Sequence, residues 1–172
     1  MIEKVLSEKQ IRERILELGS EISKDFSGKN MIIVSVLKGA FVFTSDLIRS
    51  ISIPFKLDFV QLFSYGASKT SSGKVEMKKD TGIDIAGKNV LIVEDIIDVG
   101  YTLDFLLTHL REKNPASVDV CVLLDKVERR KIEVPVRYRG FEVPDKFLVG
   151  YGLDFDEDFR GLPYIGEIKE KA

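Results

Sequence analysis

An acidic pair directly after an apolar run is the feature of this sequence best suited to chemistry. The run Val90–Val93 is uninterrupted, as expected of a parallel strand that is buried on both faces, and Glu94 and Asp95 follow it. A short turn then leads into a helical apolar pattern, with Asp98, Gly100, Thr102 and Leu103 in order. The carboxylates are therefore expected where a buried strand emerges.

This order predicts a crevice at the carboxyl end of a parallel sheet, where open α/β proteins bind their ligands. The free backbone N–H groups of a helix N-terminus hold a phosphate. Neighbouring carboxylates can hold sugar hydroxyls or Mg²⁺. A phosphate beside a sugar diol points to a phosphorylated ribose as the ligand.

The ordered set resembles the phosphoribosyl-diphosphate (PRPP) motif of the type I phosphoribosyltransferases, in the form found in hypoxanthine-guanine phosphoribosyltransferases. The likeness runs from about Leu6 to Ile168. It departs at Val99, where the family usually has Thr or Ser, so one hydroxyl for the 5′-phosphate is missing. Backbone N–H groups, with Gly100, Tyr101 and Thr102, remain for that phosphate, and we expect weaker phosphate binding rather than loss of activity.

The resemblance implies Mg²⁺-dependent transfer of ribose 5-phosphate from PRPP to N9 of hypoxanthine or guanine, giving IMP or GMP and diphosphate. In that reaction Glu94 and Asp95 hold the ribose hydroxyls and, directly or through water, Mg²⁺. Asp154 matches a ligand of a second Mg²⁺ on the diphosphate. Asp98 matches the acidic residue that faces purine N7 as general base, and with residues 99–102 it borders the ribose phosphate.

Further matches concern the diphosphate. Lys38 and Gly39 match a turn that binds it and can hold a cis peptide bond, and a glycine there lets phosphate oxygens approach the backbone. Arg160 matches a second ligand, for which a guanidinium is well suited. Ser64 and Tyr65 match a lid that closes over the diphosphate and excludes water.

Three matches concern the purine. Lys126 matches the donor to the oxygen at purine C6, and an ammonium, which can only donate, favours 6-oxopurines over adenine. Phe147 matches the residue that stacks on the base. Leu148 matches a residue whose backbone meets the 2-position edge.

The elements that must position these residues alternate between strand and helix. A capping box at Ser7 and Gln10 begins a helix that ends near residues 27–28. The other expected helices are 40–51 and 103–111, and the expected strands are 31–36, 55–63, 75–79, 90–93, 118–124, 146–151 and 165–168, with a mobile loop over 64–74. The pattern predicts an α/β fold with a central, mainly parallel twisted sheet flanked by helices.

Composition is that of one globular domain spanning residues 1–172. The resemblance divides it into a core of about residues 30–140 and a small hood built from the N-terminal residues and about 141–172. Of its 172 residues, 44% are hydrophobic and 31% charged, and the net charge is −2, which argues against a nucleic-acid footprint. The basic cluster Lys126, Arg129, Arg130 and Lys131 is expected to be a solvated turn. The start of the chain shows no signal peptide and no apolar run reaches membrane-spanning length, so we expect no membrane partner and a cytoplasmic protein.

Two single residues are assigned structural roles. The lone cysteine, Cys121, is expected to be a buried small hydrophobe within a strand. His109 has no cysteine or second histidine nearby, and we expect an exposed or packing residue rather than a metal ligand or base.

Two other functions stay open. One is a phosphoribosyltransferase that prefers xanthine. The other is a non-catalytic nucleotide-sensing regulator of the same fold that binds RNA or DNA, which Val99 favours and the absence of a continuous basic stripe opposes. For the leading function the expected partners are PRPP, a 6-oxopurine and further copies of the chain, as a homodimer or homotetramer.

Overall fold

Two separate sheets organise the chain. A computed structural model describes residues 1–64 and 75–169. Its larger sheet has the order β4 (Val75–Lys79), β3 (Phe55–Ser64), β2 (Met31–Leu37), β5 (Asn89–Ile97), β6 (Ser117–Asp125) and β7 (Tyr138–Glu142). Neighbouring strands in it are parallel except for the β3–β4 pair. The predicted α/β fold with a mainly parallel sheet is confirmed.

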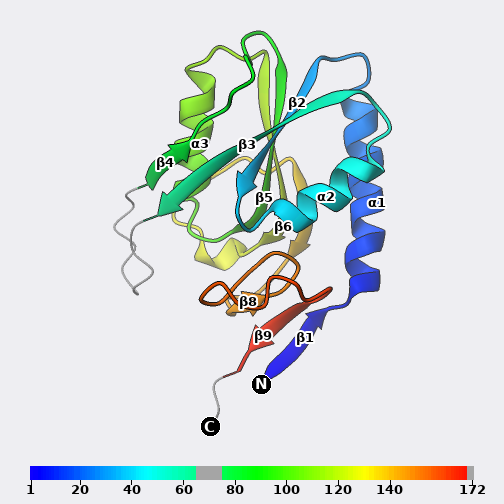
Figure 1. Cartoon of the computed structure of the whole chain (residues 1–172), viewed down its shortest axis with the longest axis vertical. Helices are drawn as coiled ribbons and strands as arrows, with labels where there is room; N and C mark the ends of the chain where they lie inside the picture. The colour runs from blue at the N-terminus through cyan, green and yellow to red at the C-terminus, as the bar shows by residue number, and fades with distance from the viewer. Residues whose placement is uncertain (65–74, 170–172) are drawn as a thin grey trace.

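The smaller sheet joins the two ends of the chain. It is antiparallel, with the order β1 (Ile2–Leu6), β9 (Ile165–Ile168) and β8 (Leu148–Val149). Figure 1 shows it beyond the carboxyl ends of the parallel strands. It therefore lies beside the edge of the large sheet at which the acidic pair was predicted.

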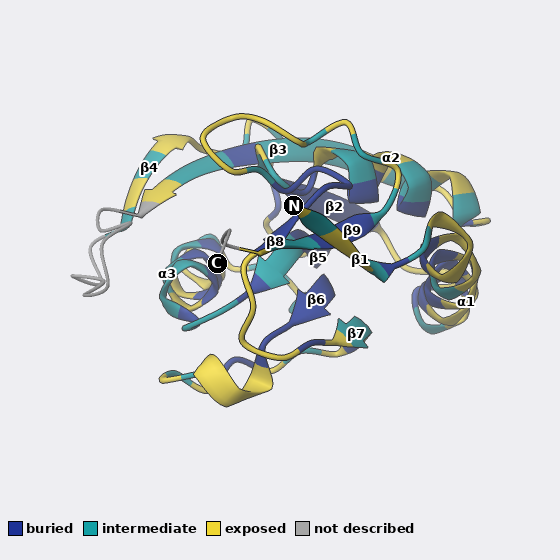
Figure 2. Ribbon diagram, turned by 90° about the horizontal axis from the view of Figure 1, so that it is seen from below, coloured by how far each residue is buried: buried dark blue, intermediate teal, exposed yellow. Residues whose placement is uncertain are grey.

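Helices cover both faces of the large sheet. α1 (Glu8–Asp25) and α2 (Phe41–Ser50) lie on one side and α3 (Tyr101–Arg111) on the other (Figure 2). Alternate strand residues divide between two buried clusters: Ile33, Leu91 and Cys121 pack toward α1 and α2, while Ile32, Val90 and Val120 pack toward α3. Burial on both faces explains the uninterrupted apolar runs of the central strands. Cys121 is buried as predicted.

The start of α1 follows the sequence prediction. The Ser7 hydroxyl accepts from the Gln10 backbone N–H, and the Gln10 side chain accepts from the Ser7 N–H at 2.9 Å. This capping box fixes the point at which the chain turns from β1 into the helix.

Several boundaries differ from prediction. β5 continues past Val93 to Ile97, so Glu94 is paired with β6 inside the strand and not beyond its end. α3 begins at Tyr101, two residues earlier than expected, and the strand predicted over 146–151 is only β8. β1 and β7 were not predicted, because their sequences are short, partly charged and half-exposed at sheet edges.

The order of strands places the ligand crevice. From β2 the chain moves outward through β3 to β4, and it then returns on the other side of β2 as β5. The topological switch point of the sheet is therefore between the carboxyl ends of β2 and β5, where open sheets bind ligands. Among the helices in the described ranges, none is long and apolar enough to cross a bilayer.

Asp80 joins the end of β4 to α3. Its carboxylate lies 2.8 Å from His109 Nε2 and accepts from Lys113 Nζ at 2.6 Å. Partial burial raises the pKa of Asp80, but the bonds from Lys113, His109 and the Thr81 backbone outweigh it and lower that pKa to about 2. His109, expected to be exposed or packing, is thus a partly exposed hydrogen-bond partner of Asp80 that stacks on Phe105.

Replacing Asp80 with Asn should lower the melting temperature at neutral pH by about 2–4 °C, since partly exposed ion pairs contribute about 1 kcal/mol. A carboxylate with a lowered pKa stabilises the fold above its ordinary value and loses that effect on protonation. The deficit should therefore shrink as the pH falls from 3.8 to about 2. Melting curves of both proteins from pH 7 to pH 2 check this, and a deficit unchanged across the range would contradict it.

Candidate active site

A polar cavity of about 390 Å³ opens at the switch point. It collects residues from the ends of β2 and β5, the start of α3 and the segment before β9. Seven residues predicted from the sequence line it: Lys38, Gly39, Glu94, Asp95, Thr102, Asp154 and Arg160. Side chains separated by more than a hundred positions in the sequence thus meet at one edge of the sheet.

The turn after β2 forms one wall of this cavity. The Leu37–Lys38 peptide bond is cis. A Cβ atom on Gly39 would lie 1.9 Å from Asp95 Oδ2, so any side chain there would displace this carboxylate or the turn. A Cβ atom on Gly152, whose φ is +103°, would lie 2.2 Å from the Gly39 carbonyl oxygen. The turn is therefore packed tightly between the acidic strand and the segment that follows β8.

Both cations of the cavity, Lys38 and Arg160, are hydrogen-bonded to a carboxylate of the chain itself, that of Glu157. Glu157 Oε2 accepts from Lys38 Nζ at 3.0 Å and from Arg160 Nη2 at 3.2 Å. The bond from Lys38, and then that from Arg160, lowers the pKa of Glu157. Sequence reasoning missed Glu157, and its position three residues before Arg160 was the only available signal.

The acidic pair has two different environments. Only 6% of the Glu94 surface is exposed, while Asp95 is half-buried. Burial, and then the neighbouring charge of Asp95, raises the pKa of Glu94 well above its ordinary value. Asp154 is already engaged, since its oxygens lie 2.9 Å from Arg160 Nη2 and accept from the Glu157 N–H at 2.9 Å.

The predicted phosphate position is the N-terminus of α3. Gly100 precedes the helix with φ +103°, and a Cβ atom there would lie 2.9 Å from the Ile132 carbonyl oxygen. No side chain caps this helix. The first-turn backbone N–H groups of this helix, at its positive dipole end, thus have no side-chain acceptor, and Thr102 borders the polar cavity. Val99, which precedes the helix, has no hydroxyl that could donate to a phosphate beside these N–H groups.

A second group of charges follows β5. Lys126 Nζ lies 3.7 Å from Asp98 Oδ2 and 3.6 Å from Asp145 Oδ1. Arg129 donates from Nε to Asp98 Oδ1 at 2.8 Å and from Nη1 to Asp145 Oδ2 at 3.2 Å. Two carboxylates and two cations thus alternate beside the end of β5.

The predicted solvated basic turn is wrong for Lys126 and Arg130, whereas Arg129 and Lys131 are exposed. Lys126 is buried, Arg129 bridges two carboxylates, and Arg130 Nη2 donates at 2.7 Å to Asp125, which is fully buried. The burial of Lys126 escaped prediction because the carboxylates beside it, Asp98 and Asp145, are distant in sequence.

An exposed aromatic surface lies near these charges. Phe147 is 54% exposed and packs edge-on against Phe155, with ring centroids 5.4 Å apart. Leu148 is buried in β8. The sequence prediction missed Phe155, although it follows Asp154 directly. Of the predicted lid, Ser64 ends β3, and Tyr65 lies outside the described residues.

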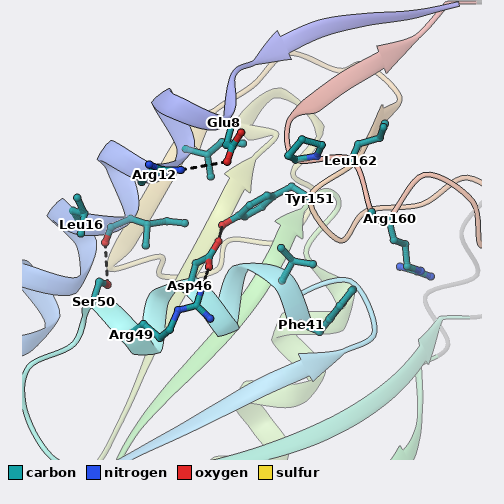
Figure 3. Close-up of a pocket in the computed structure, with 15 residues that line it drawn as sticks. Glu8, Arg12, Leu16, Phe41, Asp46, Arg49, Ser50, Tyr151, Arg160 and Leu162 are labelled. Atoms are coloured by element: carbon teal, nitrogen blue, oxygen red, sulfur yellow. Dashed lines mark hydrogen bonds and ion pairs between the residues drawn. The ribbon is translucent and has the colours of Figure 1, made fainter.

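A larger cavity of about 650 Å³ lies nearby, between α1, α2 and the segment 160–163 (Figure 3). Most of its charged side chains are paired with one another: Glu8 with Arg12, and Asp46 with Arg49 and the Tyr151 hydroxyl. Arg160, which also borders it, pairs with Asp154 and Glu157 instead. Burial, and then the contact with Asp46, raises the pKa of Tyr151. Because its polar groups are partnered and its walls are mainly apolar, this cavity is a weaker candidate for chemistry.

Comparison with known proteins decides the family to which a chain with this site belongs. The family model of the phosphoribosyl transferase domain matches residues 1–156. The chain belongs to the phosphoribosyltransferase family. The match covers every predicted site residue of this phosphoribosyltransferase except Arg160.

Individual relatives extend the similarity to the whole phosphoribosyltransferase chain. It is 49% identical to the hypoxanthine-guanine phosphoribosyltransferase of Dictyostelium discoideum, over 99% of this chain and 97% of the relative. It is 43% identical to the hypoxanthine phosphoribosyltransferase of Escherichia coli, over 97% and 95%. A crystal structure of a hypoxanthine-guanine phosphoribosyltransferase from Bacillus anthracis superposes with a TM-score of 0.93 at 45% identity, covering 98% of this chain and all of that one.

Proposed function

We propose that this phosphoribosyltransferase transfers the 5-phosphoribosyl group from PRPP to N9 of hypoxanthine or guanine, and so salvages purines. The observation that carries the proposal is the pairing of two sites at the end of β5. One is the polar cavity that holds Lys38, Arg160 and the acidic pair. The other is the cluster of Asp98 with the buried ammonium of Lys126. The first fits a sugar diphosphate and the second fits a 6-oxopurine.

Binding of the diphosphate would use the turn after β2. Lys38 and Arg160 supply positive charge, and Gly39 lets phosphate oxygens reach the backbone. Glu94 and Asp95 would accept hydrogen bonds from the ribose diol. The N-terminus of α3 would hold the 5′-phosphate. Together these contacts fix the ribose carbon between the leaving group and the base, which lowers the barrier by orientation.

The residues present fit Mg²⁺. Glu94, Asp95 and Asp154 border the same cavity, yet no group of three metal-ligating side chains occurs within residues 1–64 and 75–169. A sparse set of carboxylates is typical for Mg²⁺, which keeps several waters and binds the substrate's phosphates. When bound, the ion would neutralise charge on the departing diphosphate.

The purine would lie between Phe147 and the charged cluster. Lys126 donates to the oxygen at C6, and Asp98 accepts the proton of N7 as the bond to N9 forms. Adenine presents an amino group to Lys126, which leaves two donors facing one another, at a cost of about 1–3 kcal/mol. This supports a preference for 6-oxopurines.

Three further expectations join this proposal. The small sheet would serve as the hood over the base, since β8 follows Phe147 directly. A homodimer or homotetramer is expected, and Leu16 and Phe41, 59% and 45% exposed beside the larger cavity, are candidates for subunit contacts. A cytoplasmic location stays a prediction from the sequence.

Replacing Glu157 with Gln should lower the KM for PRPP about twofold to fivefold, because an exposed ion pair contributes up to about 1 kcal/mol and here competes with the diphosphate for Lys38 and Arg160. The KM for the purine should be unchanged. Steady-state kinetics with PRPP varied at saturating hypoxanthine measure this. A KM for PRPP that rises would instead make Glu157 a supporting residue.

The function itself is tested by nucleotide formation from PRPP and Mg²⁺ with hypoxanthine, guanine, xanthine and adenine, each alone. Turnover of the first two and not of adenine is expected. Activity on xanthine alone would keep the mechanism and change the base. Absence of turnover with salt-sensitive binding of RNA or DNA would favour the regulator that Val99 leaves open.

A further inference from the structure

We propose that Arg129 is a positioning residue that keeps Lys126 free for the purine, with Asp145 as its anchor. The inference rests on the proposed function for its substrate and on the geometry of the Asp98 cluster for its mechanism. Arg129 does not itself line the polar cavity and would act through the two groups that face the base.

The first step is the division of hydrogen bonds within the cluster. Arg129 makes the short contacts, at 2.8 Å to Asp98 and 3.2 Å to Asp145. Lys126 Nζ lies 3.7 and 3.6 Å from the same carboxylates, beyond hydrogen-bond distance. The carboxylates are therefore held by the guanidinium, and the ammonium keeps its donors available for another acceptor.

The second step is charge. Asp98 and Asp145 with Lys126 alone would carry an excess negative charge, whereas Arg129 makes the group neutral. Lys126 is the more enclosed of the two cations, with 10% of its side chain exposed against 44% for Arg129. Without Arg129 the nearest counter-ion for both carboxylates would be this buried ammonium, which would then close onto them.

The third step is that backbone hydrogen bonds hold Arg129 within reach of Asp98. The Lys126 N–H donates to the Ile97 carbonyl at 3.0 Å, and the Arg129 N–H donates to the Lys126 carbonyl at 3.0 Å. The following residues, Lys131 and Ile132, donate to the Val99 carbonyl at 3.1 and 3.3 Å. The segment after β6 is thus fixed along the Asp98 loop on both sides, so Arg129 meets Asp98 in a defined register.

The guanidinium is suited to this role. Its planar fork presents donors in two directions, one toward each carboxylate, whereas an ammonium is a point charge. Arg129 therefore fixes the distance between Asp98 and Asp145, and with it the place left for Lys126. The geometry accounts for an arginine, rather than any cation, at this position.

The test separates the two substrates. In Arg129→Gln, Lys126 should be drawn to Asp98 and Asp145, and the KM for hypoxanthine should rise about tenfold while the KM for PRPP stays within about twofold. Arg129→Lys, which keeps the charge without the fork, should recover part of the loss. Glu128→Gln, on the same turn and exposed, is the matched control and should leave both constants unchanged.

A double-mutant cycle tests the route of the effect. In the Lys126→Gln background, Arg129→Gln should add no further rise in the KM for hypoxanthine, because the group it acts through is gone. A rise of the same factor in both backgrounds would overturn the proposal. An unchanged KM for hypoxanthine in the single variant would overturn it as well.

A crystal structure of Arg129→Gln tests the position of Lys126 without any turnover. Lys126 Nζ should move to hydrogen-bond distance from Asp98 or Asp145. Distances that stay near 3.6 and 3.7 Å would overturn the proposal even for an active enzyme. Absence of nucleotide formation by the unsubstituted protein would instead reject the proposed function, while the position of Lys126 would still decide this inference.

Discussion

Replacing Asp98 with Asn should reduce turnover about 10²-fold to 10⁴-fold, the usual contribution of a positioned general base. The amide has the shape of the carboxylate, and its oxygen can still accept from Arg129, so the loop after β5 should keep its geometry. It cannot take the purine proton. The KM for hypoxanthine should therefore change far less than kcat, and steady-state kinetics with both substrates varied separate the two constants.

The matched control for this variant is Asp104→Asn. Asp104 is an exposed aspartate in the first turn of α3, close to Asp98 in sequence and outside the cavity. It should retain normal kcat and KM. Near-normal turnover of Asp98→Asn would remove Asp98 from proton transfer and leave it the role of orienting the base.

The second large effect on activity is expected from a substitution of Gly39. In Gly39→Ala the new Cβ atom would lie 1.9 Å from Asp95 Oδ2 and 2.7 Å from Asp95 Cγ. The carboxylate or the turn must move, and a displacement of about 1 Å near reacting groups can cost about 10²-fold. We expect kcat/KM for PRPP to fall by at least about that factor, with a smaller effect on the KM for hypoxanthine.

Gly161→Ala is the control for the glycine variant. No atom lies within 4 Å of the Cβ that this substitution adds, so activity and melting temperature should be unchanged. The melting temperature of Gly39→Ala should also stay close to that of the parent, since the clash is with the end of one side chain at a cavity wall. A Gly39→Ala protein with normal kcat/KM would show that Asp95 has no fixed role in binding PRPP.

Much of the fold could be predicted from the sequence, because both faces of the central strands are covered. Such strands show as apolar runs, unbroken in β5 and interrupted by one polar residue each in β2 and β6, and all three were found that way. The acidic pair and Gly100 could be placed at the sheet edge for the same reason. Where burial is partial, as in β1 and β7, the pattern was lost.

The parts of the site that escaped prediction depend on contacts between distant segments. Arg129 lies 31 positions from Asp98, and Lys38 lies 119 positions from Glu157. Charge type alone does not distinguish such a residue from a surface cation, and no sequence pattern joins the two members of either pair. For this reason the burial of Lys126 within the basic turn of residues 126–131 could not be predicted.

The contact of Glu157 with Lys38 and Arg160 also bears on how a catalytic cycle would end. The two cations that we propose to bind the diphosphate would have to release it after the purine nucleotide has formed, and release of products limits many enzymes. Glu157 Oε2 lies 3.0 Å from Lys38 Nζ and 3.2 Å from Arg160 Nη2. Glu157, on the same loop as Arg160, could return to both cations as the diphosphate leaves, and its carboxylate would then replace the negative charge of the departing product.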